Sequence, residues 1–188
     1  AVFKDGSIWH TAILPVAGYQ LTRDIAIGLG LPFDVAEEMK KRYGSVMPIY
    51  EGKAESANTI AEDGHGASYQ DLCDIIRARI EGIIRLILLE LPRSEYETLV
   101  PAGLVLTGGS SNLSGIDALG REILRLPVRV GTPTNIHGIS DALRDPAYAT
   151  SVGLLLWGAK HQGEQNGKFR GFGGNLRHLV FRMRELFH

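Results

Sequence analysis

The glycine-rich stretch over 103–115 carries the strongest chemical signal in the sequence. It reads Gly-Leu-Val-Leu-Thr-Gly-Gly-Ser-Ser-Asn-Leu-Ser-Gly and leads directly into an amphipathic segment over 116–126. Paired glycines let a backbone approach a ligand closely, and the first turn of a helix presents N–H groups that have no partner within the helix. A short apolar strand, a glycine turn and a helix in this order have the geometry of a nucleotide-binding edge. An ordinary strand-to-helix turn is the alternative.

Two oppositely charged residues lie on a second predicted helix. This helix begins near Pro32, a favourable first-turn residue, and ends before Gly44. Glu37 and Lys40 are three residues apart on it and therefore share one face. Without further information, a surface ion pair explains this spacing.

The longest helical pattern covers 68–90, where isoleucine and leucine recur every three or four residues. Arg77, Arg79 and Arg85 occupy its other faces, as expected of a solvated helix surface. Cys73 lies within the apolar pattern, which predicts a buried small side chain and not a nucleophile or a metal ligand.

The last 27 residues differ from the rest of the chain. Residues 162–174 are rich in Gly and Gln and predict a flexible linker. Residues 175–188 form an amphipathic pattern in a locally basic region, which favours an interfacial membrane anchor; a terminal helix packed on its own core is the alternative. The predicted apolar face consists of Leu176, Leu179, Val180, Met183, Leu186 and Phe187.

The remaining pattern predicts the elements that position these residues. An Asp-Gly pair at 5–6 predicts an opening β-hairpin. Gly18 marks a turn before a helix that Gly30 ends, and the strand over 103–106 is apolar enough for a buried central strand. Alternating strands and helices after residue 102 indicate an α/β layer. The other predicted elements are strands at 1–3, 7–14, 46–50, 54–60 and 127–130 and helices at 21–29, 94–99, 116–126 and 146–160.

Composition excludes several functional classes. The net charge of −1 and the absence of a basic, aromatic-interleaved groove argue against nucleic-acid binding. The six histidines show no metal-ligand spacing, and no Ser, His and Asp grouping indicates a catalytic triad. This spacing predicts neither a metal site nor a catalytic residue. The sequence contains no signal peptide and no apolar run of about 20 residues, so we expect a cytoplasmic protein.

The glycine-rich stretch resembles the adenosine motif of the actin, heat-shock chaperone and sugar-kinase superfamily. Further strings, in the same order and spacing, resemble the FtsA family of actin-like bacterial cell-division proteins. These are Pro-Val-Ala-Gly-Tyr-Gln-Leu-Thr-Arg-Asp-Ile-Ala at 15–26, Ala-Glu-Glu-Met-Lys-Lys-Arg-Tyr-Gly at 36–44, Leu-Pro-Val-Arg-Val-Gly at 126–131 and Pro-Ala-Tyr-Ala-Thr-Ser-Val-Gly-Leu-Leu at 146–155.

The resemblance implies an α/β fold, namely the second lobe of an actin-like (ribonuclease H-like) ATPase with an inserted α+β subdomain. Such proteins bind ATP with Mg²⁺ between two lobes, assemble into filaments, bind the C-terminal peptide of the tubulin-like FtsZ and attach to the inner face of the cell membrane. The phosphate loops would lie upstream of Ala1. The implied domains are subdomain IIA (1–29 and 102–161), subdomain IIB (30–101), the linker and the membrane helix.

The resemblance also implies roles for single residues. Gly18, Glu37, Lys40, Gly108, Gly109 and Ser110 would contact the nucleotide, and Arg79, with Arg77 and Arg85, would meet the acidic FtsZ peptide. Ser114 stands where the family usually has proline, which makes the turn less rigid. The resemblance implies weak ATPase activity at most, and none for this chain alone. A kinase or chaperone ATPase of the same superfamily, or a pilus-assembly scaffold, remains the alternative.

Overall fold

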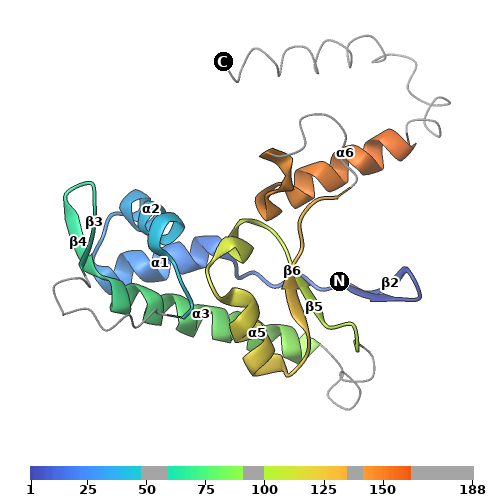
Figure 1. Cartoon of the computed structure of the whole chain (residues 1–188), viewed down its shortest axis with the longest axis horizontal. Helices are drawn as coiled ribbons and strands as arrows, with labels where there is room; N and C mark the ends of the chain where they lie inside the picture. Colours follow the sequence, from blue (N-terminus) through green and yellow to red (C-terminus); the bar gives the residue numbers. More distant parts are fainter. Residues whose placement is uncertain (48–58, 91–99, 135–141, 162–188) are drawn as a thin grey trace, which may run out of the picture. The chain divides into compact units, whose positions relative to one another are not determined.

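The computed structural model describes residues 1–47, 59–90, 100–134 and 142–161. The chain divides into two compact units, Ala1–Ala149 and Thr150–His188, and the elements of the first unit are arranged as in Figure 1. Three predicted segments lie entirely outside the described residues: the helix at 94–99, the linker and the terminal amphipathic helix. Most of each strand predicted at 46–50 and 54–60 also lies outside them.

Two β-hairpins share one turn chemistry. Strands β1 (Val2–Lys4) and β2 (Ser7–His10) pair in antiparallel fashion around Asp5 (φ 50°) and Gly6 (φ 77°), which confirms the predicted hairpin, although the second strand ends at His10 and not near Leu14. Strands β3 (Thr59–Glu62) and β4 (His65–Ser68) repeat this arrangement around Asp63 and Gly64. The sequence analysis missed this second hairpin.

Three helices form one side of the first unit: α1 (Gly18–Leu29), α2 (Phe33–Tyr43) and α3 (Tyr69–Glu90). Helix α1 ends at Gly30 in the left-handed conformation, and α2 begins after Pro32, both as predicted. The prediction of a turn at Gly18 was wrong, because Gly18 is the first residue of α1. The Gln20 side chain accepts a hydrogen bond from the Ala17 N–H at 2.9 Å, and the helix starts three residues earlier than the apolar spacing suggested.

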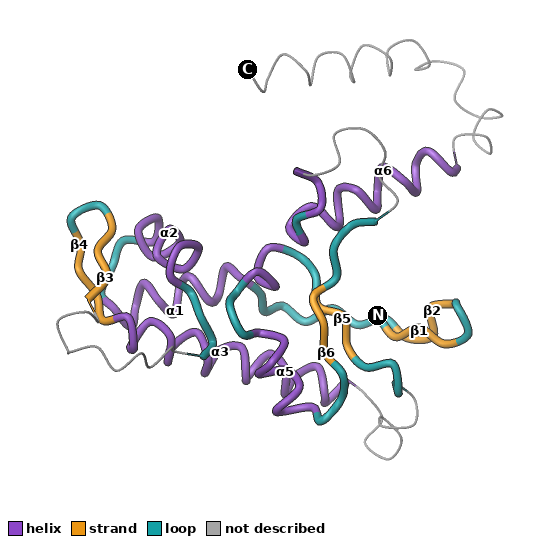
Figure 2. The backbone as a smooth tube through the Cα atoms, viewed as in Figure 1, coloured by secondary structure: helices purple, strands orange, loops and turns teal. Residues whose placement is uncertain are grey.

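The glycine-rich stretch lies in a β-α-β unit (Figure 2). Strand β5 (Leu104–Leu106) runs parallel to β6 (Val128–Val130), and the connection contains the 3₁₀ turn η2 (Gly109–Asn112) and helix α5 (Ile116–Leu124). The prediction of a fully buried strand was wrong: Val105 is 47% exposed. Leu104 and Leu106 face the core on the same side as Val128, whereas Val105 alternates to the opposite face of a sheet that has two strands in the described chain.

The segment predicted as one helix over 146–160 consists of two elements. The 3₁₀ turn η4 (Pro146–Tyr148) follows another 3₁₀ turn, η3 (Ala142–Arg144), and precedes helix α6 (Ala149–His161). Asp145 accepts a hydrogen bond from the Ala147 N–H and caps η4, which sets this 3₁₀ turn apart from the start of α6. None of the helices within the described ranges is both long and apolar enough to cross a membrane.

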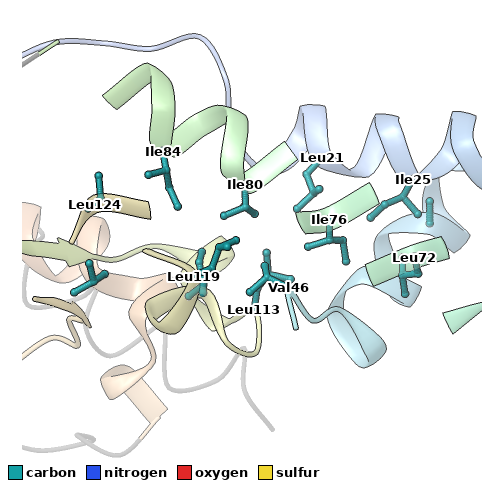
Figure 3. Packing of buried hydrophobic residues seen from close by; sticks show 13 residues of the cluster. Leu21, Ile25, Val46, Leu72, Ile76, Ile80, Ile84, Leu113, Leu119 and Leu124 are labelled. Atoms are coloured by element: carbon teal, nitrogen blue, oxygen red, sulfur yellow. The ribbon is translucent and has the colours of Figure 1, made fainter. Parts of the chain in front are cut away.

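The core of the first unit follows the apolar face of α3 (Figure 3). Isoleucines of α3 contact the buried face of α1 along one side and α5 along the other. Cys73 is fully buried in α3, as predicted. The main buried contributors are Leu21 and Ile25 of α1, Leu72, Ile76, Ile80 and Ile84 of α3, Leu119 and Leu124 of α5, and Val46 and Leu113 from the loops. This cluster spans both predicted subdomains, whose boundaries stay a prediction.

Candidate nucleotide site

A pocket of about 740 Å³ opens where the start of α1, helix α2, the η2 turn and the η4 turn meet. Its volume falls within the range of small-molecule sites. Residues far apart in the sequence form its wall, and all of them belong to the first unit. The lining residues are Gly18, Tyr19, Phe33, Glu37, Lys40, Lys41, Gly44, Gly109, Ser110, Asn112, Leu113, Asp145 and Ala147.

Five of the six predicted nucleotide residues therefore line one pocket. The sixth, Gly108, lines a smaller apolar pocket of about 330 Å³ instead. Gly108 has φ 92°, a conformation that favours glycine, and its N–H donates to the Pro146 carbonyl at 3.0 Å. It shapes the turn that carries Gly109 and Ser110 toward the larger pocket.

Gly18 brings the start of α1 against the η2 turn. A Cβ atom at this position would lie 2.7 Å from Ser110 Oγ and 3.7 Å from Lys40 Nζ. The absence of a side chain at Gly18 therefore permits the contact between α1, α2 and the glycine-rich turn.

Glu37 and Lys40 form a partly buried polar network and not an ordinary surface ion pair. Lys40 Nζ lies 2.6 Å from Glu37 Oε2, 2.7 Å from Thr22 Oγ1 and 3.3 Å from the Gly18 carbonyl oxygen. The Thr22 hydroxyl also contacts Glu37 Oε2. Only 11% of the Lys40 side chain is exposed.

The charge of Glu37 is maintained by this network. Burial raises the pKa of its carboxyl group, but hydrogen bonds from Lys40 and Thr22 and the positive charges of Lys40 and Lys41 outweigh burial and leave the pKa below its ordinary value. Glu37 therefore presents an ionised carboxylate to the pocket at neutral pH.

The sequence analysis missed the far wall of the pocket, where η2 meets η4. Asp145 Oδ1 accepts hydrogen bonds from the Ala147 N–H and from Asn112 Nδ2, each at 2.8 Å. These two bonds, the backbone bond first, hold the pKa of Asp145 below its ordinary value. The Asp-Pro pair at 145–146 is a typical start of a helical turn and could have identified this cap, but nothing in the sequence pairs it with Asn112.

An aromatic pair was also missed. Tyr19 of α1 and Phe33 of α2 lie at the pocket with ring centroids 5.1 Å apart and planes inclined by 39°. Both side chains are partly exposed, so they offer apolar ring surface to a flat ligand.

The three predicted peptide-binding arginines lie outside the pocket and on different sides of α3. Arg79 forms an ion pair with Asp24 of α1, whereas Arg77 contacts Glu122 of α5 at 3.2 Å. Arg77 and Arg85 both contact Glu81, at 2.9 Å and 3.7 Å. The structure thus places Arg77 and Arg85 along one side and separates Arg79 from them.

No cluster of His, Cys, Asp and Glu within the described ranges is suited to hold a metal ion. The predicted membrane-facing residues of 175–188 lie outside those ranges.

Comparison with known proteins gives the family. The family described as "Cell division protein FtsA" matches residues 1–153. The chain belongs to the FtsA family. This chain is 40% identical over 167 residues to FtsA of Pseudomonas aeruginosa, covering 87% of this chain and 40% of that protein. It is 34% identical to FtsA of Escherichia coli K12 (84% and 40% covered) and 34% identical to FtsA of Bacillus subtilis (86% and 36%). The chain thus spans about two fifths of the length of these relatives.

The fold resembles that of solved actin-like structures. MreB 5 of Spiroplasma citri bound to AMPPNP aligns with a TM-score of 0.58 at 18% identity, covering 86% of this chain and 50% of that one. The ADP-bound form aligns with a TM-score of 0.57 at 15% identity, covering 82% and 48%. The α/β actin-like fold expected from the FtsA resemblance is confirmed.

The contact between Asn112 and Asp145 yields a pH-dependent prediction. Asn112→Asp places a second carboxylate beside Asp145 and should lower the melting temperature at pH 7 more than Asn112→Ala does. As the pH falls toward about 4, the carboxyl introduced at position 112, whose pKa the neighbouring charge of Asp145 raises, becomes protonated and can donate to Asp145, so the difference between the two variants should narrow. The double change Asn112→Asp with Asp145→Asn restores the donor and acceptor pair and should recover most of the loss. An Asn112→Asp melting temperature equal to that of Asn112→Ala at pH 7 would contradict the observed contact.

Proposed function

We propose that this chain forms one wall of the adenine-nucleotide site of a cell-division adaptor that links the FtsZ ring to the cytoplasmic membrane. The observation that carries the proposal is the convergence of Gly18, Glu37, Lys40, Gly109 and Ser110, which come from three separate segments, on one pocket. The structural relatives with the same fold are described as bound to AMPPNP and to ADP, which supports an adenine nucleotide as the ligand. Membership of the FtsA family favours an adaptor over a kinase, a chaperone or a pilus-assembly scaffold.

In this proposal the base and ribose lie against the glycine-rich turn and the network of Glu37 and Lys40. The backbone of Gly109 permits close approach, and the rings of Tyr19 and Phe33 supply apolar surface. Nucleotide binding would control assembly into filaments, with Mg²⁺ accompanying the phosphates of ATP.

The charges of the described lining limit its affinity for a triphosphate. Lys40 and Lys41 are both within ion-pair distance of Glu37, and Asp145 adds another carboxylate to the wall. The formal charges of these four side chains cancel, so this wall alone offers no net attraction to phosphate groups.

The isolated 188-residue chain is therefore expected to bind ATP weakly and not to hydrolyse it. Isothermal titration calorimetry should give a dissociation constant above the micromolar range, with no phosphate release in a coupled assay. Micromolar or tighter binding by this chain would contradict the charge argument.

We propose that the acidic C-terminal peptide of FtsZ binds at Arg79 on α3. The Arg79 guanidinium already forms an ion pair with Asp24, and 36% of the Arg79 side chain is exposed. An acidic peptide must therefore compete with Asp24 for Arg79, and the hydrogen bond and charge of Asp24 keep the pKa of Arg79 raised.

Two variants test the competition. Arg79→Glu should abolish binding of a fluorescent FtsZ tail peptide in an anisotropy titration, whereas Asp24→Asn should strengthen binding because it removes the competing carboxylate. Arg85→Glu is the matched control on the other side of α3 and should have the smaller effect. Unchanged binding by Arg79→Glu would remove this site from the account.

We propose that residues 175–188 attach the protein to the inner face of the membrane at the division site. Co-sedimentation with anionic vesicles should retain the full chain, and a chain ending at residue 174 should stay in the supernatant. Raising the salt concentration should weaken the binding, because Lys and Arg near an anionic surface act partly through screened electrostatic attraction. Equal sedimentation of both chains would refute the anchor.

A further inference from the structure

We propose that Thr22 is a positioning residue of the nucleotide pocket, whose buried hydroxyl holds the Glu37 carboxylate and the Lys40 ammonium in one fixed arrangement. The nucleotide part of this inference rests on the function proposed above. The positioning part rests on the geometry of the free chain.

Thr22 is located at the meeting point of α1 and α2. Its side chain is fully buried, and its Oγ1 atom lies 2.9 Å from the Gly18 carbonyl oxygen and 2.7 Å from Lys40 Nζ, in contact with Glu37 Oε2. A threonine hydroxyl carries one proton and two lone pairs. It can accept from Lys40 while it donates to Glu37 or to the Gly18 carbonyl, so its one proton and one of its lone pairs are used within the network.

This network also uses the three donors of Lys40. The ammonium group points at Glu37 Oε2, Thr22 Oγ1 and the Gly18 carbonyl oxygen, at 2.6, 2.7 and 3.3 Å. A lysine with three partners in fixed directions loses its usual freedom of rotation, so its position in the pocket wall is set before a ligand arrives.

Thr22 also determines which oxygen of Glu37 faces a ligand. Oε2 is occupied by Thr22 and Lys40, whereas Oε1 has Lys41 Nζ as its neighbour, at 3.8 Å. An ionised carboxylate oxygen accepts hydrogen bonds, and the hydroxyl groups of a ribose are matching donors. Oε1 is thus the atom that this arrangement leaves for a sugar hydroxyl.

Packing alone does not require a threonine at this position. Threonine in a helix often donates to the carbonyl four residues earlier, as Thr22 does to Gly18, but here the same oxygen also reaches two charged side chains of the next helix. Valine has nearly the same shape and lacks only the hydroxyl, so the pair of variants Thr22→Val and Thr22→Ser separates the role of the hydroxyl from that of the side-chain volume.

The first measurement follows the Glu37 carboxyl by ¹³C NMR in the wild-type chain and both variants. The charged groups facing it are Lys40 and Lys41 of α2, and the polar group facing it from α1 is Thr22. Wild type and Thr22→Ser should titrate below the ordinary pKa of glutamate. Thr22→Val should titrate at a higher pH than both, because a hydrogen bond to the charged form is lost. Identical titration of all three chains would overturn the positioning role.

The second measurement compares ATP with 2′,3′-dideoxy-ATP by chemical-shift titration. Wild type and Thr22→Ser should prefer ATP to a similar degree, whereas Thr22→Val should lose most of a preference of roughly tenfold, the effect of one hydrogen bond to a charged group. Retained preference in a folded Thr22→Val chain would overturn the role toward ribose. Absence of any ATP response in wild type would refute the proposed function while the carboxyl titration still decides the role of Thr22.

Two further variants guard against misfolding. Thr22→Ala also lacks the hydroxyl and replaces Thr22→Val if that chain does not fold. In a Glu37→Gln background, removal of the hydroxyl should no longer change the ATP preference, because the carboxylate through which Thr22 acts is absent. An unchanged loss of preference in that background would show that Thr22 acts through packing and would overturn the inference.

Discussion

The burial of α3 between α1 and α5 is the constraint on which the described structure depends. Ile76, Ile80 and Ile84 lie in the cluster that also holds Leu21 of α1 and Leu119 of α5. Each such side chain contributes about 1.5–3 kcal/mol when fully buried. Since α1 carries Gly18 at its start and α5 follows the glycine-rich turn, packing against α3 brings these two segments together. The pocket depends on this packing, because its lining residues come from several elements and no single element encloses it.

Helix α1 links the two sites proposed for the chain. Gly18 lines the pocket and Thr22 contacts α2, while Asp24, two residues after Thr22, contacts Arg79 of α3. Residues two apart in a helix point to opposite sides, so one rigid helix carries both contacts. A peptide that displaces Asp24 and a nucleotide that contacts Gly18 at the start of α1 would therefore act on the same element.

Local sequence rules predicted the features that depend on neighbouring residues. The Asp-Gly hairpin at 5–6, the helix end at Gly30 and the start of α2 after Pro32 all follow from backbone preferences of a few residues. The same rule applied to Asp63-Gly64 would have found the second hairpin, which lacks strong strand formers at 65–68. Contacts between distant segments had no local signal. Thr22 has no such signal because only the fold brings α2 to it, and the contact between Asn112 and Asp145 joins two turns 33 positions apart.

The most direct test of the central claim is a ¹⁵N NMR titration of the full chain with ATP at millimolar concentration. The account predicts the largest amide shifts at Gly18, Gly109 and Ser110 and in the segment around Glu37 and Lys40, with GTP at the same concentration causing smaller changes at these positions. Shifts that are absent there, or that concentrate on α3 around Arg79 instead, would contradict the assignment of this pocket as an adenine-nucleotide wall.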